Sequence, residues 1–266
     1  MVESILVLVV AGYAALATAY LEARRRREAP PRWARTAGPL LVLLHFGGLF
    51  GLGMAIGRSP FSTLDQALSF LAFSLAALYL LLEATSRVAA YGGSFYALAA
   101  IVAAISVPGL VRADTLTELP AANPTRSMHV GLGLLSVAAV LVAGLLAMGY
   151  LNVYRRMKHR KLDEAPGPSL SSFQRLTRNA SFVGVLLLLP SLILGLVDAL
   201  ADGAPSGLMF LTGAVGVQLV MLLAAAWLWW RRPLKGKTAA WLNVAAAALV
   251  LIATAVIHPL VLSGGA

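Results

Sequence analysis

Residues 128–161 read MHVGLGLLSVAAVLVAGLLAMGYLNVYRRMKHRK, a long apolar run that ends in a cluster of basic residues. As an α-helix, such a run is long enough to cross the hydrocarbon core of a bilayer, which is about 30 Å thick. The cations that follow it favour the water-facing side of the membrane. This stretch therefore predicts a transmembrane helix with a basic end.

The same pattern recurs along the whole chain of 266 residues, of which 59% are hydrophobic and only 12% charged. Soluble domains carry about 25% charged residues, so the composition is that of a membrane protein. We expect an all-α, polytopic membrane helical bundle that forms one transmembrane domain over residues 1–266. About eight spans are predicted, near residues 4–22, 38–57, 66–84, 94–111, 128–151, 180–201, 208–230 and 239–262.

The basic residues predict how these spans are oriented. Of the 21 lysines and arginines, 18 lie in the segments after the first, third, fifth and seventh spans. By the positive-inside bias those segments are cytoplasmic, and both termini face outward. The net charge of +10 is thereby assigned to topology and to contacts with anionic lipids, so no nucleic-acid partner is expected. The first apolar run precedes its charges, which predicts a permanent helix rather than a cleaved signal peptide.

The sequence contains no cysteine. This excludes disulfides, thiolate metal sites, iron–sulfur ligation and thioether attachment to this chain. No glycine-rich phosphate loop, zinc-protease motif or nucleophile constellation is present either, so we expect no enzyme activity.

Two of the four histidines are predicted to lie at one depth. His129 is the second residue of the span 128–151, which runs inward. His258 comes about twenty residues into the last span, which runs outward, so it is about 30 Å from the cytoplasmic face. Both imidazoles are then at the outer edge of the bilayer, where they could form an axial pair for a haem iron or two corners of a metal site. The alternative is a pair of interfacial histidines bonded to headgroups or carbonyls.

The other two histidines have different surroundings. His45 lies about 12 Å from the cytoplasmic edge of the second span, where a neutral imidazole would favour ligation or a hydrogen bond. The competing interpretation is a bundle-facing histidine bonded to a carbonyl or to a polar side chain such as Asn243. His159 lies among cytoplasmic cations and is expected to be a solvated loop residue. Glu83, at the inner end of the third span, is expected to have a structural role.

Five stretches, in order along the chain, resemble the integral membrane cytochrome c assembly family, which includes CcsA, CcmC and the HemX-like proteins. They are residues 41–53 (LVLLHFGGLFGLG), 59–87, 128–161, 172–199 and 256–260 (VIHPL). The resemblance implies haem handling, with His129 and His258 flanking a haem that is presented for attachment to cytochrome c. It also implies that His45 serves an intramembrane haem.

The chain departs from that family in two places. The family carries a tryptophan-rich outer loop between the two outer histidines, whereas residues 198–207 here read DALADGAPSG. The family's second intramembrane histidine is missing from residues 208–230. We therefore interpret the chain as a divergent member of the family, with haem as its expected cofactor.

These observations predict a haem-binding or haem-handling protein of the cytochrome c maturation type, a multi-pass protein of the bacterial cytoplasmic (inner) membrane. One alternative is a non-catalytic scaffold or accessory subunit that packs against other membrane proteins of a respiratory or assembly complex. Another follows the HemX-like branch, in which the basic cytoplasmic segments contact a soluble partner and regulate haem synthesis.

Overall fold

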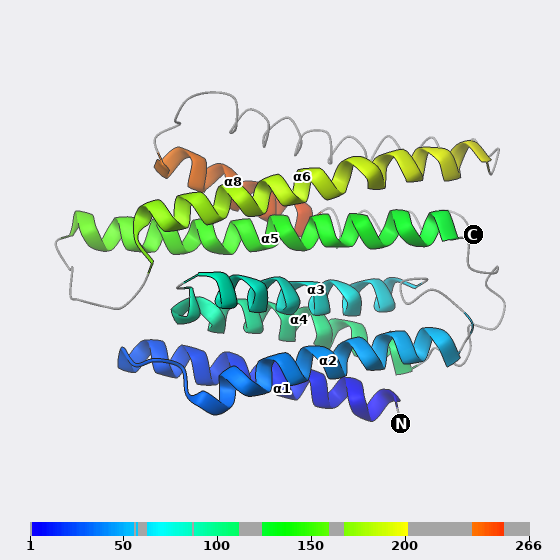
Figure 1. Cartoon of the computed structure of the whole chain (residues 1–266), viewed down its shortest axis with the longest axis horizontal. Helices are drawn as coiled ribbons and strands as arrows, with labels where there is room; N and C mark the ends of the chain where they lie inside the picture. Colours follow the sequence, from blue (N-terminus) through cyan, green and yellow to red (C-terminus); the bar gives the residue numbers. More distant parts are fainter. Residues whose placement is uncertain are drawn as a thin grey trace. The chain divides into compact units, whose positions relative to one another are not determined.

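The computed structural model describes residues 2–55, 57, 63–86, 88–111, 124–159, 168–201 and 236–252. All regular structure within these ranges is helical (Figure 1). The elements are α1 (Val2–Arg26), α2 (Arg32–Ala55), α3 (Leu64–Thr85), η1 (Ala89–Tyr91, a 3-10 helix), α4 (Gly92–Val111), α5 (Pro124–Lys158), α6 (Leu170–Ala201) and α8 (Gly236–Ile252).

Five of these helices are long and apolar enough to cross a membrane, namely α1, α2, α3, α5 and α6, while α4 and α8 contribute shorter apolar stretches. The prediction of an all-α membrane bundle is thus confirmed for the described part of the chain. The predicted span 208–230 lies outside the described residues, so the number eight stays a prediction. Helices α5 and α6 both begin before the predicted spans, α6 by about ten residues, and both beginnings are polar sequence.

Local sequence explains where several helices begin and end. Helix α3 starts with a capping box: the Thr63 hydroxyl accepts the backbone N–H of Gln66, and the Gln66 side chain accepts the backbone N–H of Thr63. Helix α1 ends at Arg26, and the next residue, Arg27, adopts a left-handed φ of 62°. The next N–H, that of Glu28, then bonds back to the carbonyl of Ala23 at 2.9 Å.

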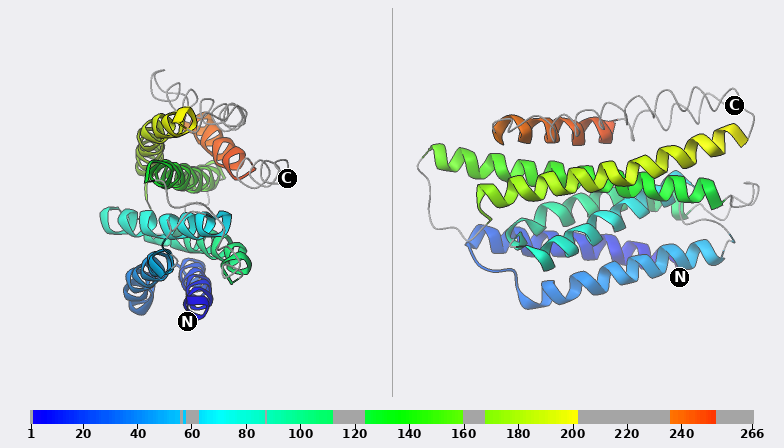
Figure 2. Two further views of the ribbon diagram at one scale, coloured as in Figure 1. Left: turned by 90° about the vertical axis from the view of Figure 1, so that its right-hand side faces the viewer. Right: turned by 45° about the horizontal axis from the view of Figure 1, so that its top comes forward.

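The chain divides into two compact units, residues 1–134 with 163–168, and residues 135–162 with 169–266. In the first unit, α4 packs against both α1 and α3, and α2 contacts α1 and α3. Figure 2 shows α1 and α2 as neighbouring helices. The prediction of a single transmembrane domain is not tested by this division, since both units are helical and apolar.

In the second unit, helices approach each other closely through small residues. Gly144 of α5 lies directly against Ala247 of α8. The Ser136 hydroxyl of α5 donates to the carbonyl of Gly184 in α6 at 2.7 Å. Small residues of this kind allow backbones to pack together inside a membrane, where apolar area alone gives no preference for a helix over lipid.

Candidate functional site

The interior of the first unit holds His45, which is fully buried. Its Nδ1 lies 3.0 Å from the Tyr13 hydroxyl of α1, and its Nε2 lies 2.9 Å from the Ser69 hydroxyl of α3. The ring of Phe73 meets the imidazole edge-on, with centroids 6.0 Å apart. His45 therefore joins three helices through two hydrogen bonds.

This arrangement does not fit an axial haem ligand. An iron needs a free ring nitrogen and open space in front of it, whereas both nitrogens of His45 have hydrogen-bond partners and the side chain has no exposed surface. The sequence left ligation and hydrogen bonding open, and the structure shows the hydrogen-bonded arrangement. We therefore leave His45 out of the haem-binding proposal below.

The partner that the sequence suggested for His45, Asn243, forms its hydrogen bonds with other residues. The Asn243 amide of α8 donates to the Ala239 carbonyl, and its oxygen accepts the Ser181 hydroxyl of α6 at 2.7 Å. The true partners, Tyr13 and Ser69, were missed. Their only signal in the sequence is that each is a polar side chain within an otherwise apolar span.

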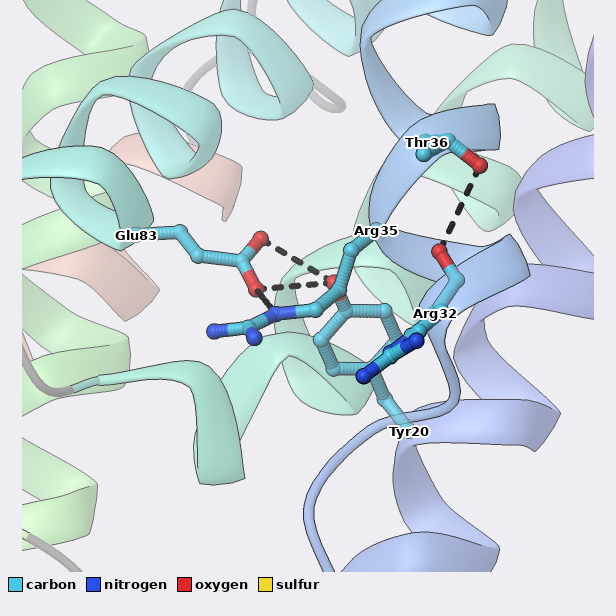
Figure 3. Close-up of polar contacts among 5 residues, drawn as sticks. All are labelled: Tyr20, Arg32, Arg35, Thr36 and Glu83. Carbon is cyan, nitrogen blue, oxygen red and sulfur yellow. Dashed lines mark hydrogen bonds and ion pairs between the residues drawn. The ribbon is translucent and has the colours of Figure 1, made fainter.

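A second polar cluster joins the same helices near the end that carries the arginines (Figure 3). The Tyr20 hydroxyl donates to both carboxylate oxygens of Glu83, at 2.9 and 3.0 Å. The Arg35 Nε lies 3.6 Å from the same carboxylate. Glu83 is thus held by α1 and α2, which agrees with the structural role expected for it.

The predicted outer pair is only partly within the described residues. His129 is the sixth residue of α5, is half-buried, and takes part in interactions there. His258 lies outside the described residues, so the shared depth of His129 and His258 stays a prediction. Within the described ranges, no group of three or more histidine, aspartate or glutamate side chains could hold a metal ion.

His159 follows α5, is exposed, and donates its backbone N–H to the Arg155 carbonyl. Its exposure agrees with the solvated position expected from the sequence. It therefore serves as a control in the experiments below.

Comparison with known proteins shows which family the sequence matches. The sequence model of a family described as cytochrome C assembly protein matches residues 61–260, three quarters of the chain. The chain belongs to the cytochrome c assembly family. No curated protein and no solved structure matches it.

Membership supports a role of the cytochrome c maturation type, and with the apolar helices it identifies a multi-pass membrane protein. The matched segment contains both His129 and His258. It does not contain His45, Tyr13 or Tyr20, because α1 and α2 precede residue 61. The two polar clusters of the first unit thus join helices outside the family match to α3 inside it.

Proposed function

We propose that this protein handles haem for cytochrome c maturation and binds it between His129 and His258. The match of the cytochrome c assembly family to residues 61–260, which includes both histidines, carries the proposal. His129 is half-buried near the start of α5, so its side chain is not enclosed as that of His45 is. An imidazole from each of two helices can supply the two axial ligands of a haem iron.

The proposal assigns binding and presentation of haem to this chain, with no enzymatic step. The cytochrome that receives the haem would come from other membrane-associated proteins of the assembly system. We place the protein in the bacterial cytoplasmic membrane, with the histidine pair facing outward and the basic segments inside.

Titration of the purified protein with haem, followed by its absorption spectrum, tests the haem-binding proposal. We expect a Soret band that is lost or strongly weakened in His129→Ala and in His258→Ala, because each variant removes one axial ligand. His159→Ala is the matched control and should bind as the wild type does. A protein that stays colourless during titration, or a His129→Ala variant with an unchanged spectrum, would contradict the proposal.

A scaffold role is the second candidate, and one observation favours it. On α2, Gly47 and Gly51 are exposed, and a Cβ at either position would meet no atom within 4 Å. Glycines four residues apart on an open helix face allow another membrane helix to approach closely. Stoichiometric co-purification with an assembly or respiratory complex that is lost in Gly47→Leu would support this role.

A further inference from the structure

The segment that joins α1 to α2 is rich in arginine. Residues 24–35, called the basic turn below, contain six arginines and one acidic residue, Glu28. By the positive-inside bias we expect this turn at the cytoplasmic face of the membrane, where anionic lipids attract basic segments. Attraction of that kind depends only on the amount of charge. The contacts within the turn show, however, that its arginines are not equivalent.

Three arginines at the end of α1 already interact within the protein. The Arg26 Nε donates to the Glu22 carboxylate at 2.8 Å, and Arg25 lies 4.0 Å from the same carboxylate. Arg27, the residue after α1, also takes part in interactions. A guanidinium that is paired with a carboxylate has part of its charge neutralised and some of its N–H groups occupied.

Two further arginines attach the basic turn to neighbouring elements. The Arg24 guanidinium of α1 lies 4.4 Å from the centre of the Tyr91 ring in η1. The Arg35 Nε of α2 lies 3.6 Å from the Glu83 carboxylate of α3. Both ends of the turn are therefore held in place, and the start of α2 is presented in a defined orientation.

Arg32, the first residue of α2, differs from the other five. Its side chain is exposed, and within the described part of the chain its guanidinium has no ion pair or hydrogen bond. Figure 3 shows no contact to this guanidinium, whereas that of Arg35 reaches Glu83. An unpaired guanidinium can bind a phosphate group through two parallel N–H bonds.

The face of α2 next to Arg32 suits an acyl chain. Trp33 is 55% exposed, and an indole is favoured at the boundary between headgroups and hydrocarbon. Leu40 follows Trp33 by seven residues and Leu43 follows Arg32 by eleven, which is about two and three helical turns, so each leucine lies on the same side as the residue before it. Both leucines are exposed. They lie about 10 Å and 16 Å further along the helix, beyond a headgroup layer that is only about 5–7 Å thick.

We propose that Arg32 and Trp33 form a binding site for one anionic phospholipid. The phosphate lies on the Arg32 guanidinium, the indole of Trp33 lies at the level of the glycerol backbone, and one acyl chain follows Leu40 and Leu43. This narrows the lipid contacts expected from the net charge to a defined site. It goes beyond the haem-handling proposal and does not depend on it.

The surrounding charge selects the headgroup. The six arginines of the basic turn outnumber the acidic residues near them, Glu22, Glu28 and Glu83. An ammonium group, as in a zwitterionic headgroup, would be repelled by this excess of positive charge. The site therefore favours a phosphodiester whose second substituent is uncharged, as in phosphatidylglycerol.

Arg26 provides a matched control. Arg26→Gln and Arg32→Gln remove the same charge from the same exposed turn. Arg26 donates to Glu22, whereas Arg32 is unpaired. Attraction by net charge alone would weaken equally in the two variants, but binding at the proposed site would weaken only in Arg32→Gln.

Quenching of Trp33 fluorescence by brominated lipids tests the site. Trp33 is made the only indole by replacing the other four tryptophans, Trp227, Trp229, Trp230 and Trp241, with phenylalanine. The full-length protein is placed in phosphatidylcholine vesicles that contain a small fraction of phosphatidylglycerol, with bromine on the acyl chains of one lipid or the other. We expect phosphatidylglycerol to bind beside Trp33 about tenfold more strongly than phosphatidylcholine, as for a hydrogen bond to a charged group. Arg32→Gln should reduce this preference to less than about twofold, and Arg26→Gln should leave it within about twofold of the starting value.

Native mass spectrometry of the chain with all five tryptophans gives a second measurement. Retention of one phosphatidylglycerol fewer in Arg32→Gln than in Arg26→Gln supports the site. The proposal is overturned if both lipids quench Trp33 equally, or if Arg26→Gln loses as much preference as Arg32→Gln. It is also overturned if excess inorganic phosphate abolishes the preference, because the site would then take a soluble anion. Thermal unfolding verifies that the compared variants are folded.

Discussion

At the scale of single residues, His45 shows how a buried polar group is accommodated inside a membrane protein. Both ring nitrogens are bonded, one to Tyr13 and one to Ser69, on two different helices. Without these partners, burial of an imidazole in apolar surroundings would be unfavourable. The two partners therefore offset the cost of burying the imidazole.

Ser69→Ala should lower the free energy of unfolding, because it leaves Nε2 of His45 buried without a partner. Interhelical hydrogen bonds in membrane proteins contribute about 0.6 kcal/mol on average and at most about 1.7 kcal/mol, which sets the expected range. Ser74→Ala is the control, since Ser74 is equally buried on α3 but donates only to the Phe70 carbonyl of its own helix. Denaturant unfolding in detergent would measure both, and an equal loss for Ser74→Ala would count against the argument.

At the scale of elements, helix packing in the first unit depends on where glycine meets a large side chain. Gly38 of α2 receives the Tyr96 hydroxyl, and Gly92 of α4 receives that of Tyr79. The glycines of the second span behave differently from one another. Gly48 lies 3.0 Å, measured from an ideal Cβ, from Ile5 of α1, whereas Gly47 and Gly51 face open space.

Gly38→Ala should lower the free energy of unfolding by about 1–3 kcal/mol, because the added methyl group overlaps the Tyr96 hydroxyl in a packed interior. Gly47→Ala, on the same helix, meets no neighbouring atom and should change stability by no more than about 0.5 kcal/mol. Thermal unfolding of the two variants in one detergent compares them. Helix propensity favours alanine over glycine at both positions, so an equal loss of stability in the two variants would show that overlap with the Tyr96 hydroxyl is not the cause.

At the scale of the whole molecule, the distribution of basic residues predicts which ends of the helices are cytoplasmic. Helices α1 and α5 both end in arginines or lysines. Helix α2 begins at Arg32 and carries no basic residue in its last turn, which ends at Ala55. The orientation follows from the positive-inside bias and has a direct experimental test.

Because the chain has no cysteine, single cysteines report topology without background. Arg25→Cys and His159→Cys, both at exposed positions of basic helix ends, should react with a membrane-impermeant thiol reagent only after the cells are opened. Ala55→Cys, exposed at the opposite end of α2, should react in intact cells. The reverse pattern would invert the topology and place the proposed haem site inside.

The sequence by itself determined the helical membrane class and the approximate positions of the described helices, because apolar content and helix length are local properties that each segment carries independently. It also indicated the family, which the match to residues 61–260 confirmed. The helix ends at α5 and α6 were less predictable, because a polar segment continues as a helix once its backbone hydrogen bonds are formed.

Only the tertiary structure decided which polar side chains meet. Hydropathy does not reveal that Tyr13 and Ser69 face His45, that Tyr20 and Arg35 reach Glu83, or that Asn243 bonds Ser181. The partners in these hydrogen bonds lie between 24 and 63 residues apart in the sequence. Their contact depends on how each helix is rotated about its axis, and that rotation is set by the close packing of all neighbouring helices together.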